Sequence, residues 1–392
     1  MKLAWVSAPP WAMTGYGKVT RNFLTRLNYP EQIISIATGG LTSGPFVEWE
    51  GIKVYPGMSQ EIQKGDIRVT NLEKIMKDTG SDFWVIHNDA WAYRNAIKQT
   101  SVKYPCITYS PIDGGSISIE EKLAITPAVE RVAMCKYADA EIKKVGMTAE
   151  YIPHGVDTKI YNPQSRDEWR DIFKLPKDEF IIGVVGTNIS KRKGFAELFM
   201  ALKKVYDAGK QFSVVMITNI NGQSQGGYDL WKLAEYIGLP KHLLRFPVDS
   251  FSFTEEEMAG WYNAFDIFVN VSRGEGFGIP ILESQACGTP AIVTDFSSMT
   301  ELVEGHGILI PVKSLDVYTL KTQFLAIGDY DIFGNKIIKC IDNPDLVKSM
   351  GKRAHKFAQK YDWDKVAPKW DRMFRRLDTQ GFFPPYTLKE YK

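Results

Sequence analysis

The residues best suited to chemistry lie between Glu275 and Glu283, in the run Glu-Gly-Phe-Gly-Ile-Pro-Ile-Leu-Glu. The glycines let the backbone approach a ligand closely. A helix with Pro280 at its first position would point free N–H groups and a partial positive charge at the same place, which is typical of a phosphate site. Each carboxylate can accept hydrogen bonds from two neighbouring hydroxyl groups. The run predicts a sugar-nucleotide site; a glycine-rich turn with a solvated glutamate is the alternative interpretation.

A cluster of positive charge follows the candidate strand Ile181–Val185. Lys191, Arg192 and Lys193 lie where the loop after this strand meets a helix that begins near Phe195. Cations normally avoid a helix N-terminus because the helix dipole opposes them. An anion shared between the helix and the cations removes this conflict, so the cluster predicts a diphosphate clamp. An exposed basic turn is the alternative interpretation.

Polar residues also follow two strands of the first half. His87 comes directly after Phe83–Ile86, and Asp113 comes shortly after Cys106–Ser110. Ligands of parallel sheets bind at the carboxyl ends of the strands, so one of these two residues is expected to contact a second substrate. The alternatives are a hydrogen-bonded structural histidine and a turn aspartate before two glycines.

Gly15 and Gly17 follow the first candidate strand, Leu3–Ser7. A dinucleotide site there is disfavoured, because Thr20 stands where a third glycine would be and no carboxylate follows the second strand, Ile33–Ala37. We interpret this loop as a flexible wall of a cleft between two domains, close to the sugar and the phosphates of the predicted sugar nucleotide.

The sequence around these residues alternates between strand patterns and helix patterns. This alternation is typical of parallel sheets, whose strands and helices would position the residues. The further strand candidates in the second half are Phe212–Thr218, Leu244–Pro247, Ile267–Val271, Ala291–Thr294 and Gly307–Ile310. A chain of 392 residues has room for two domains, and regular structure breaks at Pro153 and Gly155. We therefore expect an α/β chain of two Rossmann-like, doubly wound parallel-sheet domains, residues 1–153 and 154–360, facing a central cleft, with a helix and tail over 361–392.

Composition narrows the function classes. Hydrophobic residues make up 44%, charged residues 24%, and the net charge is +2, so nothing favours nucleic acid as a partner. The four cysteines form no metal or redox motif and suggest a reduced, cytoplasmic setting. No signal peptide and no run of about 20 apolar residues is visible. These features are compatible with a peripheral membrane contact.

The run Glu275–Glu283, with Ala286–Ile292 after it, resembles the E-x7-E signature of retaining glycosyltransferases of family 4. Weaker pieces of the same family pattern occur in the same order along the chain. They are Thr14–Gly17, Ile152–Asp157, Lys193–Gly194 and Glu301–Val303.

The resemblance implies a GT-B fold and metal-independent transfer of a hexose, with retention, from a UDP- or GDP-linked donor. The acceptor would be a glycan, a lipid-linked molecule or a small molecule, and no cofactor is implied beyond the donor substrate. Glu283 would hold the ribose. Glu275 and the backbone of the next three residues would hold the donor sugar, these being Gly276, Phe277 and Gly278. A helix over Trp363–Leu377, broken at Pro368, would return to the N-terminal domain.

The chain departs from the family at the diphosphate. Lys193 matches the family lysine, but Thr187 and Asn188 occupy the region of the family arginine, so Arg192 would supply the missing charge. Base contacts are expected from backbone near Phe246–Phe251. Because of these departures, a catalytically silent binding module is an alternative function. A sugar-nucleotide epimerase on the same scaffold is another.

Overall fold

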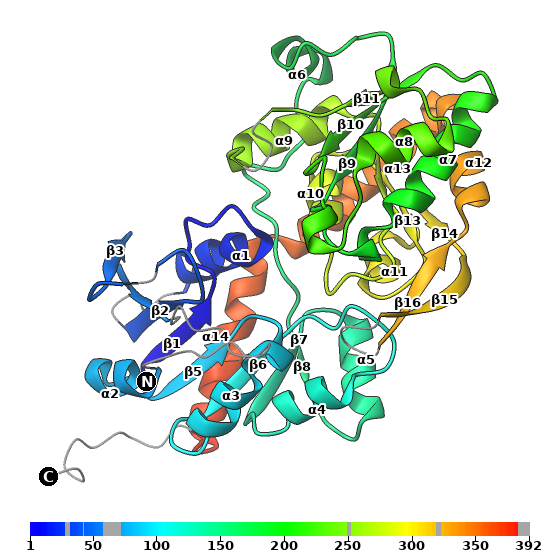
Figure 1. Cartoon of the computed structure of the whole chain (residues 1–392). Helices are drawn as coiled ribbons and strands as arrows, with labels where there is room; N and C mark the ends of the chain where they lie inside the picture. The colour runs from blue at the N-terminus through cyan, green and yellow to red at the C-terminus, as the bar shows by residue number, and fades with distance from the viewer. Residues whose placement is uncertain (28–31, 42, 58–71, 249–251, 319–322, 383–392) are drawn as a thin grey trace, which may run out of the picture. The chain divides into compact units, whose positions relative to one another are not determined.

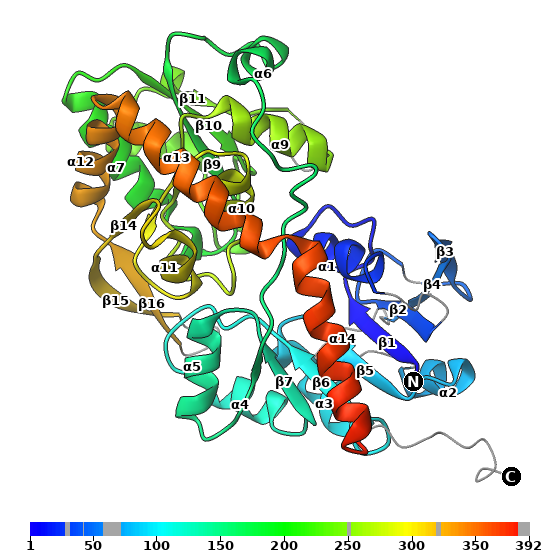
Figure 2. The same cartoon turned by 180° about the vertical axis from the view of Figure 1, so that it is seen from behind.

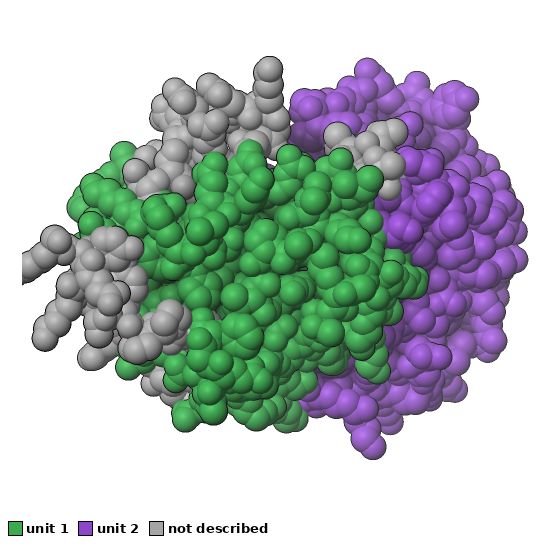
Figure 3. All heavy atoms as spheres, turned by 90° about the horizontal axis from the view of Figure 1, so that it is seen from below, with its two compact units in different colours: residues 1–112, 117–155, 363–392 green, residues 113–116, 156–362 purple. Residues whose placement is uncertain are grey.

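The structure is a computed structural model, and it describes residues 1–27, 32–41, 43–57, 72–248, 252–318 and 323–382. Contacts divide the chain into two compact units, coloured separately in Figure 3. Unit 1 comprises Met1–Ile112, Ile117–Gly155 and Trp363–Lys392, and unit 2 comprises Asp113–Ser116 and Val156–Asp362. The short run Asp113–Ser116 therefore belongs to unit 2 by its contacts, although the chain on both sides of it belongs to unit 1.

Unit 1 is built on a sheet whose strands, in the described residues, follow the order β3-β4-β2-β1-β5-β6-β7-β8. All neighbours are parallel except β3 and β4. The chain runs outward in opposite directions from the adjacent strands β1 and β5, so the sheet has its switch point between them. The strands are β1 (Leu3–Ser7), β2 (Ile33–Ala37), β3 (Val47–Trp49), β4 (Ile52–Pro56), β5 (Phe83–Ile86), β6 (Cys106–Tyr109), β7 (Glu130–Ala133) and β8 (Glu150–Tyr151).

Helices cover this sheet, and one of them comes from the far end of the sequence. The helices of unit 1 are α1 (Gly15–Leu24), α2 (Leu72–Thr79), η2 (Ala90–Tyr93), α3 (Arg94–Thr100), α4 (Ile119–Ile125), α5 (Lys136–Lys144) and α14 (Trp363–Thr379). Figure 2 shows α14 lying across one face of the sheet. Its Trp370 ring meets the rings of Trp5 and Tyr109 at centroid distances of 6.0 Å and 4.9 Å.

The predicted break of this helix at Pro368 is wrong, since α14 continues through it. A proline inside a helix costs about 3 kcal/mol or more. The buried side chains on one face of α14 lie on both sides of Pro368, so their packing holds the two halves in one helix. They are Trp363, Val366, Ala367, Trp370, Met373, Phe374 and Leu377.

Unit 2 contains a second parallel sheet, which follows the order β11-β10-β9-β12-β13-β14 in the described residues. Its switch point lies between β9 and β12. The strands are β9 (Phe180–Val185), β10 (Phe212–Ile217), β11 (Leu244–Arg245), β12 (Ile267–Asn270), β13 (Ala291–Thr294) and β14 (Ile308–Ile310). The predicted strands of both units are confirmed, with ends that agree or differ by at most two residues, whereas β3, β4, β7 and β8 were missed.

Helices lie on both faces of this sheet (Figure 1). They are α6 (Arg166–Ile172), η3 (Lys191–Lys193), α7 (Phe195–Asp207), η4 (Gln223–Gln225), α8 (Leu230–Ile237), η5 (Lys241–Leu243), α9 (Glu255–Ala264), α10 (Ile279–Ala286), α11 (Ser298–Val303), α12 (Tyr330–Ile341), α13 (Pro344–Ala358) and η6 (Gln359–Tyr361). The core beneath α7, α8 and α12 is apolar, with Phe199, Met216 and Phe333 among its buried residues. No helix in the described ranges is both long and apolar enough to span a bilayer.

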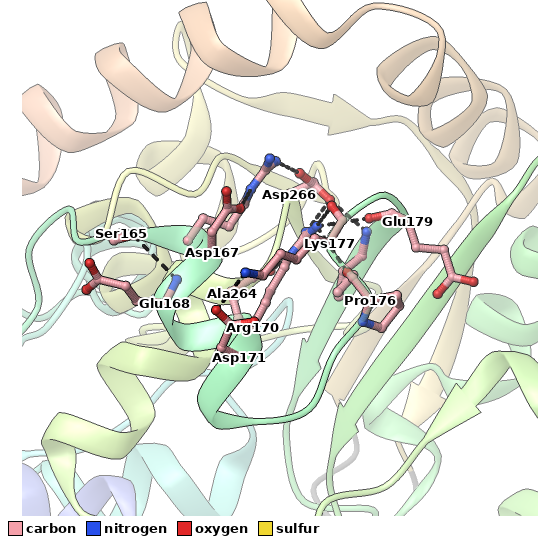
Figure 4. Close-up of polar contacts among 12 residues, drawn as sticks. Ser165, Asp167, Glu168, Arg170, Asp171, Pro176, Lys177, Glu179, Ala264 and Asp266 are labelled. Atoms are coloured by element: carbon pink, nitrogen blue, oxygen red, sulfur yellow. Dashed lines mark hydrogen bonds and ion pairs between the residues drawn. The ribbon is translucent and has the colours of Figure 1, made fainter.

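The buried guanidinium of Arg170 fixes α6 to the sheet (Figure 4). It donates to the carbonyl of Ala264 at 2.9 Å and to the carboxylate of Asp266 at 2.7 Å. Asp266 also accepts the backbone N–H of Ile181 at the start of β9. A charged group this deeply buried is stable only when its hydrogen bonds are met, so we interpret Arg170 as a structural anchor.

A small antiparallel hairpin, which the sequence analysis missed, completes unit 2. Its strands are β15 (Val312–Tyr318) and β16 (Gln323–Gly328). Gly115 forms an antiparallel bridge with Phe324, with N–H···O distances of 2.8 Å and 2.9 Å. This bridge is what places the run Asp113–Ser116 in unit 2.

Candidate active site

Two loops meet at the switch point of unit 2. One follows β9 and the other follows β12, and these strands pair in parallel, with Phe268 opposite Gly183. Both loops therefore leave the same edge of the sheet, where ligands of open α/β sheets bind. The amide of Arg273 in the second loop donates to the carbonyl of Arg192 in the first at 2.7 Å, which fixes the two loops to each other.

The three cations lie in the first loop, in the 3-10 turn η3 that precedes α7. Gly194, with φ +64°, follows this turn and is the N-cap residue of α7. A β-carbon on Gly194 would lie 2.1 Å from the carbonyl oxygen of Val271, so only glycine fits there. This glycine turns the chain so that Arg192 and Lys193 lie beside the second loop.

Glu275 joins the two loops through ion pairs with both cations. Lys193 Nζ lies 2.5 Å from Oε1 of Glu275, and Arg192 Nη1 lies 3.3 Å from Oε2. The exposed fractions of the three side chains are 10% for Glu275, 17% for Lys193 and 19% for Arg192. The structure thus brings together three of the predicted site residues in a largely desolvated cluster.

Burial and neighbouring charges shift the pKa values of this cluster in opposite directions. Burial alone would raise the pKa of Glu275, but the charges of Lys193 and Arg192 outweigh it and hold the pKa below its ordinary value. Burial lowers the pKa of Lys193, and the carboxylate of Glu275 offsets part of that shift. Glu275 is therefore an ionised acceptor of hydrogen bonds at neutral pH.

Asp113 is the fourth predicted residue in this cluster. Its carboxylate lies 3.6 Å from Arg192 Nη1. The same guanidinium donates to the carbonyl of Gly274 at 2.7 Å. A β-carbon on Gly114 would lie 2.6 Å from the carbonyl oxygen of Phe324, so the approach of this run to β16 also requires a glycine.

Three serines that the sequence analysis missed hold Glu275 in place. Ser272 Oγ donates to Oε1 of Glu275 at 2.6 Å. Ser297 Oγ accepts the backbone N–H of Glu275 at 3.0 Å, and Ser298 Oγ donates to its carbonyl at 2.8 Å. Ser297 has φ +54°, a left-handed conformation that is uncommon for serine. The Ser-Ser pair after β13 was the only sequence signal for this support.

Helix α10 begins directly after the second loop. Gly278 precedes it with φ +95°, and the helix starts at Ile279, so Pro280 is its second residue and the predicted first position is wrong by one. Gly276 and Phe277 are buried in the loop. Glu283, also buried, accepts a hydrogen bond from the hydroxyl of Tyr262 at 2.9 Å.

Asn188 has a structural role that the sequence analysis did not foresee. Its buried side-chain amide donates to the carbonyl of Tyr228 at 2.7 Å and accepts the N–H of Tyr228 at 3.0 Å. A β-carbon on Gly222 or Gly227 would lie 1.9 Å or 2.3 Å from the carbonyl oxygen of Asn188. Asn188 therefore holds the glycine-rich loop 219–228 and does not replace the family arginine. Of the expected base-contact run, 249–251 lies outside the described residues.

A second charged network supports the loops from the other side. Arg273 forms ion pairs with Glu197, in the first turn of α7, at 2.5 Å and with Asp316 of β15 at 2.8 Å. Because Asp316 lies in the hairpin, this network ties the hairpin to the loop that carries Glu275.

The remaining predicted residues lie in unit 1. His87 is buried at the end of β5, and its Nδ1 lies 3.0 Å from Ser7 Oγ. Burial, with a smaller contribution from His154, holds the pKa of His87 well below its ordinary value. Gly15 begins α1, and a β-carbon on Gly17 would lie 2.2 Å from the carbonyl of Ala12, so packing alone accounts for Gly17.

Comparisons with known proteins agree with this architecture. Residues 179–327 match the family model "Glycosyl transferases group 1". The D-inositol 3-phosphate glycosyltransferase of Corynebacterium jeikeium is 27% identical over 237 residues, which cover 59% of this chain and 52% of that protein. The protein of the same name from Streptomyces bingchenggensis is 28% identical over 241 residues, covering 59% and 49%. The chain spans about half the length of the curated relatives that it matches.

Solved structures resemble the whole chain. Sucrose-phosphate synthase from Thermosynechococcus elongatus superposes with a TM-score of 0.79 at 17% identity, covering 97% of this chain and all of that one. Anabaena Alr3699/HepE in complex with UDP-glucose gives 0.71 at 15% identity, covering 96% and 100%. At these identities the likeness concerns the fold, which is the GT-B fold expected from the sequence. The match of residues 179–327, the relatives and the fold confirm that this chain resembles the glycosyl transferases group 1 family.

Proposed function

We propose that this chain is a glycosyltransferase that moves a hexose, with retention, from a nucleoside-diphosphate sugar to a hydroxyl group of an acceptor. The observation that carries the proposal is the cluster of Glu275, Lys193 and Arg192 at the switch point of unit 2. It combines two cations suited to a diphosphate with a carboxylate suited to sugar hydroxyls. The relatives named as glycosyltransferases, and the neighbour solved with UDP-glucose, support a UDP- or GDP-linked donor.

Each residue has a proposed role. Lys193 and Arg192 neutralise the diphosphate, together with the N-terminal amides of α10. Glu275 accepts hydrogen bonds from the donor sugar, whose ring lies against the backbone of Gly276, Phe277 and Gly278. Glu283 accepts the ribose hydroxyls. The hydrogen bond from Tyr262 orients this carboxylate.

The proposed mechanism is same-face attack on the anomeric carbon. The acceptor oxygen forms its bond to that carbon as the bond to the diphosphate breaks, and the leaving phosphate takes the acceptor proton. Positive charge from Lys193 and Arg192 stabilises the leaving group, which makes the proposed transfer metal-independent. We place Asp113, rather than His87, at the reacting side, because its carboxylate contacts the Arg192 guanidinium.

The cellular location and the membrane contact of this chain are also proposals. We propose a cytoplasmic protein, and a peripheral membrane contact would be needed if the acceptor is lipid-linked. Among the described residues, no group of three or more His, Cys, Asp or Glu side chains is arranged to hold a metal ion.

The proposal is tested by nucleotide binding and by turnover. Thermal unfolding of the full chain is measured with UDP, GDP, ADP, CMP or NAD, for the wild type, Glu283→Gln and the control Glu235→Gln. Glu235 is exposed on α8. At about 100 times Kd a nucleotide stabilises by about 2.7 kcal/mol. We expect one nucleoside diphosphate to raise Tm in the wild type and the control but not in Glu283→Gln.

Turnover is then followed by NMR of the anomeric proton, which reports the stereochemistry of the product. Product with the donor's anomeric configuration supports the proposal, and inversion contradicts the proposed mechanism. Stabilisation by NAD alone would overturn the donor assignment. Binding of a nucleoside diphosphate without turnover, under any acceptor supplied, would favour a silent binding module.

A further inference from the structure

The cations proposed to hold the diphosphate are already paired with acidic side chains of the chain itself. Lys193 Nζ lies 2.5 Å from Oε1 of Glu275, and Arg192 Nη1 lies 3.3 Å from Oε2. Asp113 adds a second carboxylate, 3.6 Å from the same Arg192 nitrogen. The formal charges of these four side chains cancel, two positive against two negative. A diphosphate that enters this site must therefore compete with the carboxylates for the cations.

Glu275 is the stronger of these two internal anions. It contacts both cations, whereas the ion pair of Asp113 joins it to Arg192 alone. Glu275 is 10% exposed, so water screens its charge poorly. An ion pair in such surroundings leaves a costly unpaired charge when one partner is removed. The carboxylate of Glu275 is thus the main counter-ion of this pair of cations.

Only the side chain of Glu275 has to move for the cations to be released. Its backbone N–H donates to Ser297 Oγ at 3.0 Å, and its carbonyl accepts from Ser298 Oγ at 2.8 Å. Ser272 Oγ donates to Oε1 at 2.6 Å, so Ser272 and Lys193 share one carboxylate oxygen. A change of side-chain rotamer takes the carboxylate away from the cations while the two backbone bonds keep the loop in place.

Donor and product compete differently with this carboxylate. The diphosphate of either ligand is an anion, so it replaces Glu275 on the cations and repels its charge. A nucleoside-diphosphate sugar also brings sugar hydroxyls, which can donate to the displaced carboxylate. A free nucleoside diphosphate lacks that sugar and carries more negative charge near neutral pH, because a terminal phosphate has a second pKa of about 6. The displaced carboxylate is therefore compensated by the donor but not by the product.

We propose that Glu275 is an internal competitor of the diphosphate for Lys193 and Arg192, and that it makes the site select the nucleoside-diphosphate sugar over the free nucleoside diphosphate. The inference rests on the proposed function, because it assigns the donor and the product to this site. Return of the carboxylate to the two cations weakens the hold on the product, so Glu275 promotes product release as well as binding the sugar.

The test compares ligands with and without a sugar on the full chain, by titration calorimetry. The ligands are pyrophosphate, UDP, GDP, UDP-glucose and GDP-mannose. The proteins are the wild type, Glu275→Gln, the double variant Glu275→Gln with Lys193→Met, and the control Glu235→Gln. The control removes an exposed carboxylate from α8 of the same unit. Thermal unfolding without ligand shows whether each variant is folded.

Glu275→Gln should bind pyrophosphate and the nucleoside diphosphate about tenfold or more tightly than the wild type, because the cations lose their internal anion. Its affinity for the sugar nucleotide should rise by less, since the variant also loses a charged acceptor for the sugar hydroxyls. The double variant should not show the gain in pyrophosphate affinity, because one of the two cations is gone. Glu235→Gln should match the wild type.

A measurement on the wild type covers the case that Glu275→Gln does not fold. Because the cations are paired internally, the affinity of the wild type for the nucleoside diphosphate should change little as the salt concentration rises. Two unpaired cations would instead give a steep fall in affinity, since salt screens their attraction for the ligand. A steep fall in the wild type would contradict the internal competition.

The binding results separate this inference from the proposed function. Equal affinities of the wild type and a folded Glu275→Gln for pyrophosphate and the nucleoside diphosphate would overturn the inference and leave the proposed function intact. An equal gain in the double variant would also overturn it, because the anion would then bind away from Lys193. If Glu275→Gln gains pyrophosphate affinity while no nucleotide binds any of the proteins, the proposed function fails and the internal competition stands.

Discussion

A β-carbon on Gly274 would lie 2.2 Å from the carbonyl oxygen of Asp113, so the backbones of these two residues are in direct contact. Arg192 bridges the same pair, since its guanidinium donates to the Gly274 carbonyl and lies 3.6 Å from the Asp113 carboxylate. The position of Asp113 is therefore set by the Glu275 loop and by the hairpin strand β16, rather than by the strand that precedes it in the sequence.

We expect Gly274→Ala to impair transfer more than nucleotide binding. The added methyl group must push the run that carries Asp113 away from Arg192, and a displacement of about 1 Å can cost roughly 100-fold in rate. Steady-state kinetics should show a lower kcat, while the thermal shift with nucleotide persists. Gly39→Ala is the control, because a β-carbon there meets no atom within 4 Å. Equal kcat values for the two variants would remove Asp113 from the reacting side.

A double-mutant cycle should show strong coupling between Lys193 and Glu275. Removing one partner of a desolvated ion pair leaves the other charge unpaired, so Lys193→Met should lower the free energy of unfolding by about 3 kcal/mol. The double variant Lys193→Met with Glu275→Gln should lose less unfolding free energy than the two single variants lose together. The difference should exceed about 1 kcal/mol. Urea unfolding measures each value.

The matched control for this cycle is the ion pair of Lys203 and Asp207, which is more exposed and lies on α7. Its coupling should be about 0.5 kcal/mol or less. If the two cycles give the same coupling, the cluster at Glu275 is solvated and the proposed desolvated phosphate site is wrong.

Asn188→Ala should release the loop 219–228. The variant leaves the backbone N–H and carbonyl of Tyr228 without the partners that the amide supplies. We expect faster hydrogen exchange in peptides covering 219–228, and a loss of about 2 kcal/mol in unfolding free energy from the broken buried hydrogen bonds. Asn335→Ala, at an exposed position of α12, is the control. Unchanged exchange in Asn188→Ala would show that the glycines alone fix this loop.

Acid should weaken unit 1 through its buried histidines. Burial lowers the pKa of His154 to about 3, and the pKa of His87 is also well below its ordinary value. Both folded-state pKa values lie below the unfolded value of about 6.5, so the unfolded chain binds protons first as the pH falls. Stability from each histidine is complete above pH about 6.5, and below it falls by about 1.4 kcal/mol per pH unit until the folded pKa is reached.

This pH dependence is measured as the slope of unfolding free energy between pH 6 and pH 4.5. His154→Gln should flatten the slope by about 1.4 kcal/mol per pH unit, the effect of one proton. His242→Gln, at an exposed position, should leave it unchanged. An unchanged slope in His154→Gln would mean that the folded-state pKa of His154 is not lowered below its unfolded value.

The sequence predicted the strands and loops that carry Glu275 and Lys193, because their signals are local. Apolar runs, a glycine-rich turn and a helix start all lie within one βα unit, and parallel neighbours bring two such loops to one edge. The cluster of Glu275 with the cations follows from that geometry. The sequence analysis also identified Asp113 as a candidate.

What it missed depends on contacts between distant segments. Asp113 reaches Arg192 through a backbone bridge to Phe324, and no local pattern records that pairing. From the sequence alone, Asn188 was interpreted as a replacement for a phosphate ligand. Its contact with Tyr228 shows that it holds a loop instead. The hairpin β15–β16 was missed because the described side chains of its first strand, over 312–317, are all exposed and give no period-two pattern.

The contribution of α14 to unit 1 has a consequence for biosynthesis. As the chain leaves the ribosome, β1 to β8 emerge before unit 2, yet Trp5 and Tyr109 must wait for Trp370, near the other end of the sequence. Domains usually fold in the order of their synthesis. Here unit 2 can close first, while nascent unit 1 still exposes the apolar surface that α14 will cover. Folding of unit 1 is therefore completed only after α14 has been synthesised, and the chain that still lacks α14 is the form most in need of a chaperone.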